Sequence, residues 1–476
     1  MSRSSRLIAL AALAAGCATN PVTGRSELAL VSEGQEIQMG KEYAEQVKAS
    51  IGLYPDQNLQ AYVSRLGMRL AAQSERPNIP WQFHVVDDAS VNAFALPGGP
   101  VFITRGILGH MNSEAELVSV LGHEIGHITA RHSVQQMSKQ QLAGLGLGIG
   151  SILSPTVASA SQIAGAGLSV LFLKYGRDAE RQSDALGFKY MVREGYDPRD
   201  MASMFETLQR TGGSAEGRLP NWLSSHPNPE DRETAVRQRI DSAGAAAQAA
   251  RTTNRDAFLQ RTGGMVFGEN PREGFFRNGL FLHPDLRFQM AFPNGWKTQN
   301  TKAAVVAVSP QQDAIIQLTL GQGSPSQAAQ QFFGQQGIQS SNVTNSSING
   351  NPAVSGYFAA QTQQGQVQGI VSFVQFGNAT YQLLGYTPAA QMRQYDAVFR
   401  QAIGSFDRLQ DQSALNVQPA RLELVRVPRQ MTIEEFNRQY PSTVPVEQVA
   451  IINGLNPGGV ISAGATAKRV VGGVRP

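Results

Sequence analysis

The sequence predicts a multidomain chain: a mainly α domain with a small sheet comes first, followed by an α/β domain and a small α/β domain at the C-terminus. Three observations support this fold class. The length of 476 residues is about three times that of a typical domain. Helical periodicity prevails up to residue 240, whereas strands and turns alternate from Leu286 onward. Residues 421–476 then form a third, short unit.

The first residues are typical of a bacterial signal peptide. Arg3 and Arg6 precede a short apolar run at 7–15, which is too short to span a bilayer stably. Its end, Leu13-Ala14-Ala15-Gly16-Cys17, resembles a lipobox and contains the only cysteine of the chain. We therefore expect residues 1–17 to be a signal peptide with lipidation at Cys17. An ordinary cleaved signal is the alternative.

Helices and a few strands are expected in the first domain, 18–242. Amphipathic helices cover 32–72 with a break near 52–55, and strands cover 81–86 and 101–104. Ser113 caps a helix that we expect to continue to about Lys139. Further helices are predicted at 178–193, 199–211 and 229–240.

Residues 140–173 carry no charge. Pro155 and its polar neighbours divide the stretch into apolar pieces of about 13 and 11 residues, whereas a span needs roughly 20. We expect two helices that are buried or touch lipid, with a membrane hairpin as the alternative.

The domain that follows the first one contains few residues that could catalyse a reaction. Residues 243–275 are expected to be a linker, and 276–410 an α/β accessory domain. Asp313 is the only charged residue between Ala303 and Met392, so no catalytic group of charged residues can form there. The net charge of +4 is too small over this length to indicate nucleic-acid binding.

The segment Leu121-Gly122-His123-Glu124-Ile125-Gly126-His127 contains an HExxH pattern within a predicted helix. The four-residue spacing places His123 and His127 on one helix face, where two neutral imidazoles can bind one zinc ion. Glu124 is then positioned to take a proton from a water on the metal. The alternative is a structural role, in which both histidines are satisfied within a buried helix. An apolar helix face would then carry His-Glu-His without a partner, which costs free energy of desolvation.

Hydrolytic zinc needs a third protein ligand. The pattern HExxHxxGxxH fails, because Ala130 and Ser133 occupy its last two positions, and His132 is expected on the outer flank of the helix. A downstream helix instead carries Glu180 and Asp184 four residues apart. We expect Glu180 to be the ligand and Asp184 to accept a hydrogen bond from a zinc-bound histidine. The alternative is a solvated helix face.

These residues together resemble zinc metallopeptidase family forty-eight, which includes the CAAX prenyl protease, HtpX and BepA-type periplasmic proteases. The likeness covers about residues 20–240. It rests on Asn20-Pro21-Val22-Thr23-Gly24-Arg25, Asn92-Ala93-Phe94-Ala95-Leu96-Pro97-Gly98-Gly99, the HEIGH sequence, Glu180 with Asp184, and Ser225-His226-Pro227 with Arg232. The resemblance implies a gluzincin fold with one zinc ion on His123, His127 and Glu180, and Glu124 as general base.

His226 has two interpretations. The resemblance implies a catalytic role, in which it approaches the metal or the developing oxyanion and Arg232 supports it. Such a donor would contribute on the order of 3 kcal/mol in the transition state. Alternatively, residues 225–229 form a turn in which Asn228 caps the next helix.

A substrate-binding edge is predicted after the glycine pair. Gly98 and Gly99 precede Val101 and Phe102, which we expect in an edge strand beside the zinc helix. An extended peptide could add to such an edge through main-chain hydrogen bonds. An ordinary sheet strand is the alternative.

The C-terminal units show weaker likenesses. Residues 276–410 resemble PsbP/Mog1-like α/β modules through the segment 288–296, and residues 421–476 follow the spacing of a degenerate LysM-like domain. A LysM-like unit would bind peptidoglycan, and a structural cap is the alternative.

The predicted function is that of a zinc-dependent endopeptidase of the bacterial cell envelope. Its substrates would be misfolded or unassembled envelope proteins, and its location the periplasm, with an outer-membrane lipid anchor at Cys17. No acidic residue follows Cys17, which favours the outer membrane by resemblance to enterobacterial sorting rules. The alternatives are a chaperone-like or a peptidoglycan-binding module with a latent or regulatory zinc site.

Overall fold

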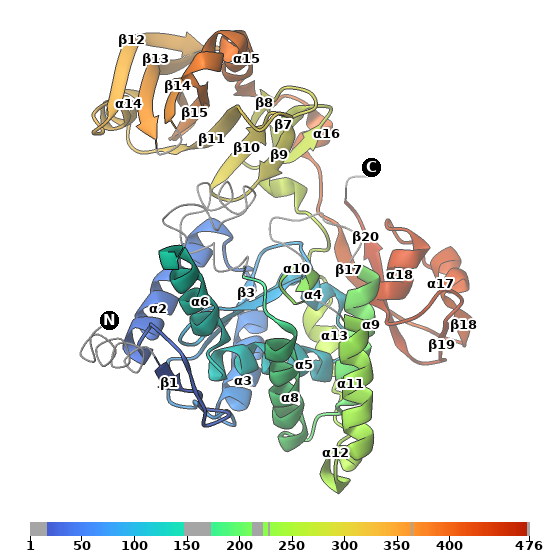
Figure 1. Ribbon diagram of the computed structural model, residues 1–476. Coiled ribbons are helices and arrows are strands. Elements are labelled where there is room, and N and C mark those ends of the chain that lie inside the picture. Colours follow the sequence, from blue (N-terminus) through green and yellow to red (C-terminus); the bar gives the residue numbers. More distant parts are fainter. Residues whose placement is uncertain (1–16, 147–172, 212–221, 227–228, 363–364, 474–476) are drawn as a thin grey trace, which may run out of the picture. The chain divides into compact units, whose positions relative to one another are not determined.

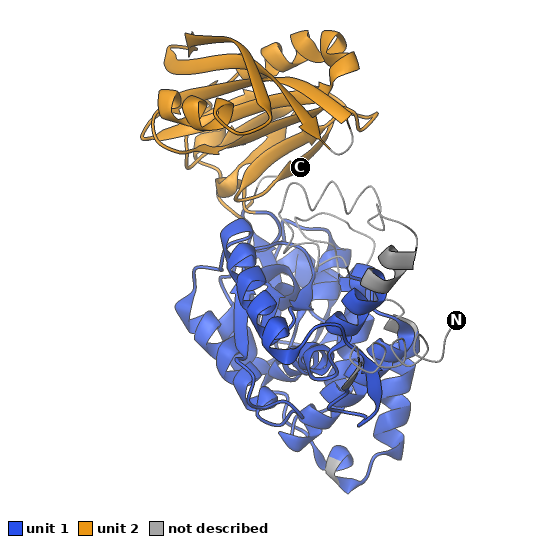
Figure 2. Cartoon of the chain, turned by 60° about the vertical axis from the view of Figure 1, so that its left-hand side comes forward, with its two compact units in different colours: residues 1–269, 420–472 blue, residues 270–419, 473–476 orange. Residues whose placement is uncertain are grey.

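A computed structural model describes residues 17–146, 173–211, 222–226, 229–362 and 365–473. The chain divides into two compact units (Figure 2). Unit 1 consists of residues up to 269 together with 420–472, and unit 2 consists essentially of 270–419. The prediction of a multidomain chain with a helical first part and several sheets is confirmed. Most of the segment at 140–173, with its two predicted helices, lies outside the described residues.

Unit 1 is largely helical (Figure 1). Its helices before residue 270 are α2 (Glu33–Ser50), α3 (Gln57–Ala71), α4 (Arg105–His110), α5 (Glu114–Thr129), α6 (His132–Gly146), α8 (Arg177–Arg193), α9 (Arg199–Thr211), α10 (Trp222–Ser225), α11 (Pro229–Ser242), α12 (Ala245–Ala249) and α13 (Arg255–Thr262). The short strands β1 (Cys17–Thr19) and β2 (Ser26–Leu28) pair antiparallel near the start. None of the helices in the described residues combines the length and the hydrophobicity that a membrane span requires.

A three-stranded sheet of unit 1 has the order β3-β5-β4. Its strands are β3 (Gln82–Val86), β4 (Ala93–Ala95) and β5 (Pro100–Thr104). Strand β5 runs parallel to β3 and antiparallel to β4, so both of its sides are occupied. The predicted edge strand at Val101 and Phe102 is therefore wrong: these residues lie in the central strand. The difference arises because β4 has only three residues, too few for an alternating pattern that would mark a strand.

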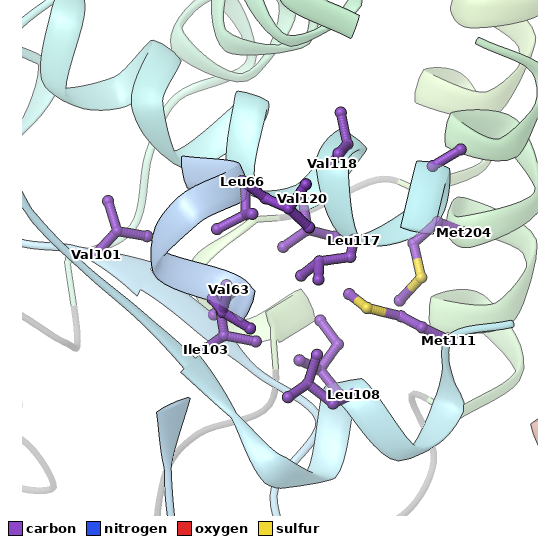
Figure 3. Close-up of a cluster of buried hydrophobic side chains, with 14 of the residues drawn as sticks. Val63, Leu66, Val101, Ile103, Leu108, Met111, Leu117, Val118, Val120 and Met204 are labelled. Carbon is purple, nitrogen blue, oxygen red and sulfur yellow. The ribbon is translucent and has the colours of Figure 1, made fainter. Parts of the chain in front are cut away.

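Apolar side chains from the sheet and from helices form the main core of unit 1. Val101 and Ile103 of β5 pack with Leu66 of α3 and Leu117 of α5 in this cluster (Figure 3). Every residue of α5 is buried, so this helix passes through the core. The core thereby fixes the position of the helix that carries the HExxH motif.

Helix α5 begins where predicted but ends early. The Ser113 side chain accepts a hydrogen bond from the Glu116 N–H and caps the helix. Arg131 then adopts a left-handed backbone with φ of 58°, and α6 starts at His132. The predicted continuous helix to Lys139 is wrong, because this one left-handed residue divides it into two helices.

Most of the segment expected to be a linker, 243–269, belongs to unit 1, and its last residues, 270–275, belong to unit 2. Helix α13 contributes Phe258 and Leu259 to the main core, and both side chains are fully buried. The Phe267 N–H donates to the Ala420 carbonyl at 2.8 Å, so the chain leaves and rejoins unit 1 at adjacent positions.

The C-terminal part of unit 1 adds two short sheets and two helices. Its elements are β17 (Arg421–Arg426), β18 (Met431–Thr432), α17 (Ile433–Gln439), α18 (Val446–Ile452), β19 (Val460–Ile461) and β20 (Thr466–Val471). The fully buried Lys468 of β20 donates to the carbonyls of Gly109 at 3.1 Å and Met111 at 2.6 Å. This side chain therefore joins the C-terminal segment to the end of α4.

Unit 2 contains a seven-stranded antiparallel sheet of order β12-β13-β14-β15-β11-β10-β9 and a four-stranded sheet of order β16-β8-β7-β6. Its strands are β6 (Phe275–Arg277), β7 (Leu280–His283), β8 (Phe288–Ala291), β9 (Lys297–Asn300), β10 (Ala304–Val308), β11 (Ile315–Gly321), β12 (Ile338–Ile348), β13 (Asn351–Thr362), β14 (Gly365–Phe376), β15 (Ala379–Pro388) and β16 (Asp407–Arg408). Its helices are η2 (Pro271–Glu273), α14 (Pro325–Phe333), η3 (Ala389–Gln391), α15 (Met392–Gly404) and α16 (Gln412–Leu415). Val371 and Phe373 pack in a cluster with α14, whereas Ile370 and Val374 pack in one with α15. Because side chains alternate along a strand, the two helices cover opposite faces of the sheet.

Candidate metal centre

Four buried side chains of unit 1 converge at one point. They are His123, His127, Glu180 and His226, and one ligand atom from each lies within 4.8 Å of the other three. His123 and His127 come from α5 and Glu180 from α8, while His226 follows α10. The structure therefore brings together the three predicted ligands and the predicted catalytic histidine.

Glycines allow the two ligand helices to approach each other closely. A Cβ atom on Gly126 of α5 would lie 2.9 Å from the Ser183 Cα of α8, and one on Gly122 would lie 3.0 Å from the Gly187 Cα. Gly122 and Gly126 each directly precede a histidine of the motif. Their spacing of four residues places them on one face of α5. The backbone of α8 can thus approach closely enough for Glu180 and Asp184 to reach the histidines.

The distances between the predicted ligands suit a small cation. The Nε2 atoms of His123 and His127 are 3.0 Å apart. The Glu180 Oε1 lies 3.4 Å from His127 Nε2, and its Oε2 lies 3.6 Å from His123 Nε2. Imidazole nitrogens and a carboxylate oxygen are ligands that zinc prefers. The residues present therefore fit a zinc ion.

Charged neighbours orient His123. Its Nδ1 lies 2.9 Å from Asp184 Oδ1, and Arg232 donates to both oxygens of Asp184. Burial alone would raise the pKa of Asp184, but the charge and hydrogen bonds of Arg232 and the hydrogen bond to His123 lower it below its usual value. The carboxylate stays ionised and can accept the His123 Nδ1–H, which leaves Nε2 free for a metal.

Glu180 is also kept ionised in a buried position. Burial alone would raise its pKa, yet His226, His127 and Arg232 together lower it well below the usual value. Arg232 Nη1 lies 2.9 Å from Glu180 Oε2 as an ion pair. One arginine therefore forms ion pairs with two carboxylates of α8.

His127 has a neighbour that the sequence did not indicate. Its Nδ1 lies 3.0 Å from His132 Nδ1, and His132 Nε2 lies 2.9 Å from Gln182 Oε1. Burial lowers the pKa of His127 well below its usual value. The expectation that His132 lies on the outer flank of the helix is wrong, because the break at Arg131 turns it inward and only 4% of its surface is exposed.

His226 lies among the ligand atoms. Its Nδ1 is 3.0 Å from Glu180 Oε1 and 3.2 Å from His123 Nε2. The ring stacks on Trp222 with centroids 4.6 Å apart, and the His226 N–H donates to the Trp222 carbonyl. The alternative turn with an Asn228 cap falls on residues 227–228, outside the described part of the chain.

Glu124 is buried beside this cluster. Its Oε1 lies 3.6 Å from His226 Nε2 and makes no hydrogen bond to a described residue. The carboxylate thus adjoins the ligands and keeps an oxygen available to accept a proton.

Two aromatic residues of the site were not predicted. The Tyr175 ring stacks on His127 with centroids 4.0 Å apart, and its hydroxyl is 2.8 Å from Ser133 Oγ. The guanidinium of Arg232 lies 4.4 Å from the centroid of the Trp222 ring. No motif spacing in the sequence marks Tyr175 or Trp222, because their roles depend on contacts across the fold.

The residues predicted to bind substrate also have structural partners. Val101 and Phe102 are fully buried, and the Gly98 N–H donates to the buried Glu36 at 3.2 Å. Gly98 and Gly99 have φ of 77° and 133°, and a Cβ on Gly98 would lie 2.5 Å from the Ile37 Cα. The glycine pair is explained by backbone conformation and close packing.

Comparison with known proteins agrees with the site. The profile of peptidase family M48 matches residues 57–240. The Escherichia coli K12 protein named beta-barrel assembly-enhancing protease is 33% identical over 231 residues, which are 47% of this chain and 47% of that protein. The chain thus spans about half the length of that relative. Metalloprotease YcaL of the same organism is 31% identical over 189 residues, 38% of this chain and 72% of YcaL.

Two further similarities cover shorter parts of the chain. The Arabidopsis thaliana mitochondrial metalloendopeptidase OMA1 is 34% identical over 171 residues, 35% of this chain and 33% of that protein. The solution structure of cyanobacterial PsbP from Synechocystis is similar to 28% of this chain over 94% of its own length, with 12% identity and a TM-score of 0.24. The matched range 57–240 contains the HExxH motif and Glu180 of this chain, and the match to YcaL extends over more than two thirds of that protein. The chain therefore belongs to peptidase family M48, a family of zinc metallopeptidases.

Proposed function

We propose that this chain is a zinc-dependent endopeptidase with one ion per chain. The observation that carries the proposal is the convergence of His123, His127 and Glu180 within a buried cluster, with Glu124 beside it. Within the described ranges, no other group of three or more His, Cys, Asp or Glu side chains is arranged to hold a metal ion.

The side chains of this site have different roles in peptide hydrolysis. Bound zinc would supply Lewis acidity toward a water and toward the substrate carbonyl. Glu124 accepts a proton from the attacking water and delivers it to the leaving amine. Asp184 and Arg232 hold His123 in the tautomer that binds metal.

His226 stabilises the oxyanion that develops on the substrate carbonyl. Its ring stacks on Trp222, and its Nε2 atom lies 3.6 Å from Glu124 Oε1. A preorganised donor at this position acts in a buried site, where such interactions are strong.

We place the enzyme in the bacterial cell envelope. The name of the Escherichia coli relative, beta-barrel assembly-enhancing protease, supports misfolded or unassembled envelope proteins as substrates. Lipidation at Cys17 would anchor the chain to the outer membrane on the periplasmic side. Residues 18–242 form the gluzincin-type domain, and 243–275 lead from it to the next domain. Residues 276–410 form the PsbP/Mog1-like domain and 421–476 a LysM-like unit that binds peptidoglycan.

A second candidate function is a chaperone-like module with a latent or regulatory zinc site. The position of His226 favours it, because its Nδ1 lies as near to Glu180 and His123 as a fourth ligand would. A zinc ion held by four side chains would have no open position for catalysis.

The variant Glu124→Gln tests the catalytic proposal. We expect it to keep one zinc per chain by elemental analysis and to lose casein cleavage by about 10²- to 10⁴-fold. Glu45→Gln, at an exposed position of α2, is the matched control and should cleave casein normally. Full cleavage by Glu124→Gln, or absence of zinc from the purified wild type, would refute the proposal.

The variant His226→Leu separates the two candidate functions. A fall in cleavage supports the oxyanion role. A rise in cleavage shows that His226 blocks the metal, as a latent site requires.

A further inference from the structure

The position of His132 depends on the break between α5 and α6. On an uninterrupted helix each residue turns about 100°, so a residue five positions after His127 would point about 140° away from it. Arg131, with φ of 58°, interrupts the helix between them. His132 consequently returns to His127, and the two Nδ1 atoms are 3.0 Å apart.

A second hydrogen bond determines the direction of this contact. His132 Nε2 lies 2.9 Å from Gln182 Oε1, an oxygen that can only accept. His132 therefore carries its ring proton on Nε2, and its Nδ1 is an acceptor. The Ser183 hydroxyl, 3.4 Å from the same Nδ1, is compatible with this assignment because it can donate.

The acceptor at His132 Nδ1 determines the tautomer of His127. The His127 Nδ1 must carry the proton to donate to it, so the lone pair lies on Nε2. That atom is 3.0 Å from His123 Nε2 and 3.4 Å from Glu180 Oε1. The lone pair is thus on the atom that faces the other predicted ligands.

We propose that His132 and Gln182 form a positioning relay that holds His127 in its zinc-binding tautomer. The inference deepens the proposed function and rests on its zinc site. The relay runs from α5 through α6 to α8, so one hydrogen-bonded chain joins the helices that carry His127 and Glu180. The Nδ1 side of His123 faces the charged pair Asp184 and Arg232. The Nδ1 side of His127 faces the uncharged imidazole of His132, which in turn contacts the Gln182 amide.

The relay is tested by zinc affinity in the full chain, measured by competition with a chromophoric chelator. His132→Leu removes the acceptor and should weaken zinc binding about 10- to 100-fold. His132→Gln keeps an acceptor oxygen and should recover most of the affinity. His84→Leu is the matched control, because His84 contacts Gln82 and Phe102 instead of the site, and its affinity should equal that of wild type.

A spectroscopic measurement tests the tautomer without any variant. In zinc-loaded protein with ¹⁵N-labelled histidine, the His127 proton should appear on Nδ1 and the His132 proton on Nε2. Protons on the opposite nitrogens, or a His132→Leu protein that binds zinc as tightly as wild type, would overturn the relay while leaving the zinc site intact. A wild-type chain that takes up no zinc would overturn the proposed function as well.

Discussion

Arg232 donates two hydrogen bonds to Asp184, from Nε to Oδ2 at 2.8 Å and from Nη2 to Oδ1 at 2.6 Å. The same Oδ1 lies 2.9 Å from His123 Nδ1. The predicted ligand His123 is therefore oriented by a carboxylate whose own position is determined by a buried cation. Arg232 also lies near both predicted ligands, with Nη2 3.1 Å from His123 Nδ1 and Nη1 2.9 Å from Glu180 Oε2.

Replacing Asp184 with asparagine should weaken the zinc site. The amide no longer provides two acceptor oxygens, and it can present an N–H to His123 and favour the wrong tautomer. We expect zinc affinity to fall about 10- to 100-fold, measured by chelator competition. Asp178→Asn, at an exposed position of the same helix, is the control. Equal affinities for the two variants would contradict the orienting role.

Replacing Arg232 with leucine should destabilise the metal-free protein. Glu180 and Asp184 would remain buried without their cation, and breaking a buried pair in this way costs about 3–5 kcal/mol. The measurement is denaturant unfolding of unit 1. Arg237→Leu, on the same helix but half-exposed, should change stability by less than about 1 kcal/mol. Similar losses of stability in both variants would show that the buried ion pairs of Arg232 contribute no more than an exposed pair.

Adding a methyl group at Gly126 should separate α5 from α8. A Cβ there would meet Ser183 backbone atoms at 2.9 and 3.1 Å, which cannot move as a flexible side chain can. We expect Gly126→Ala to cost about 1–3 kcal/mol of stability and to weaken zinc binding, since Glu180 moves with α8. Thermal unfolding and zinc titration measure both effects. Gly244→Ala has open space around its Cβ and serves as the control; if both alanines behave alike, the helices do not depend on the glycine contact.

Acid should destabilise unit 1 through His110. Burial lowers the pKa of this side chain to about 4, whereas the unfolded chain titrates near 6.5. Between these values the unfolded state binds more protons, so stability falls as the pH falls. The contribution of one such group is about 2 kcal/mol at pH 5 relative to pH 7 or above.

The variant His110→Gln should remove this part of the pH dependence. Denaturant unfolding at pH 7 and pH 5 should show a smaller loss of stability in the variant than in wild type. An unchanged pH slope would mean that His110 is not the titrating group.

The convergence of the proposed ligands was predictable because much of their geometry is local. The i, i+4 spacing within α5 and within α8 places His123 with His127 and Glu180 with Asp184, and Ser113 marks the start of α5 by its capping chemistry. Only the distance between the two helices is nonlocal. That distance depends on Gly126, which lies inside the motif, and on Gly122, which directly precedes it.

Errors arose where long-range pairing or a single dihedral angle decides the structure. Strand β4 has three residues, too few for an alternating pattern, so the central position of β5 was not visible in the sequence. No glycine or proline in the sequence marks the left-handed backbone at Arg131. The predicted position of His132 is wrong for this reason. Tyr175 and Trp222 reach the site from segments without a motif.

The chain returns at Ala420 to the place that it left at Phe267, where a main-chain hydrogen bond joins the two residues although 152 others, 268–419, lie between them. A segment whose two ends lie side by side in the fold can be inserted or replaced as one unit. Such a segment can change in length or sequence without altering the path of the chain through unit 1.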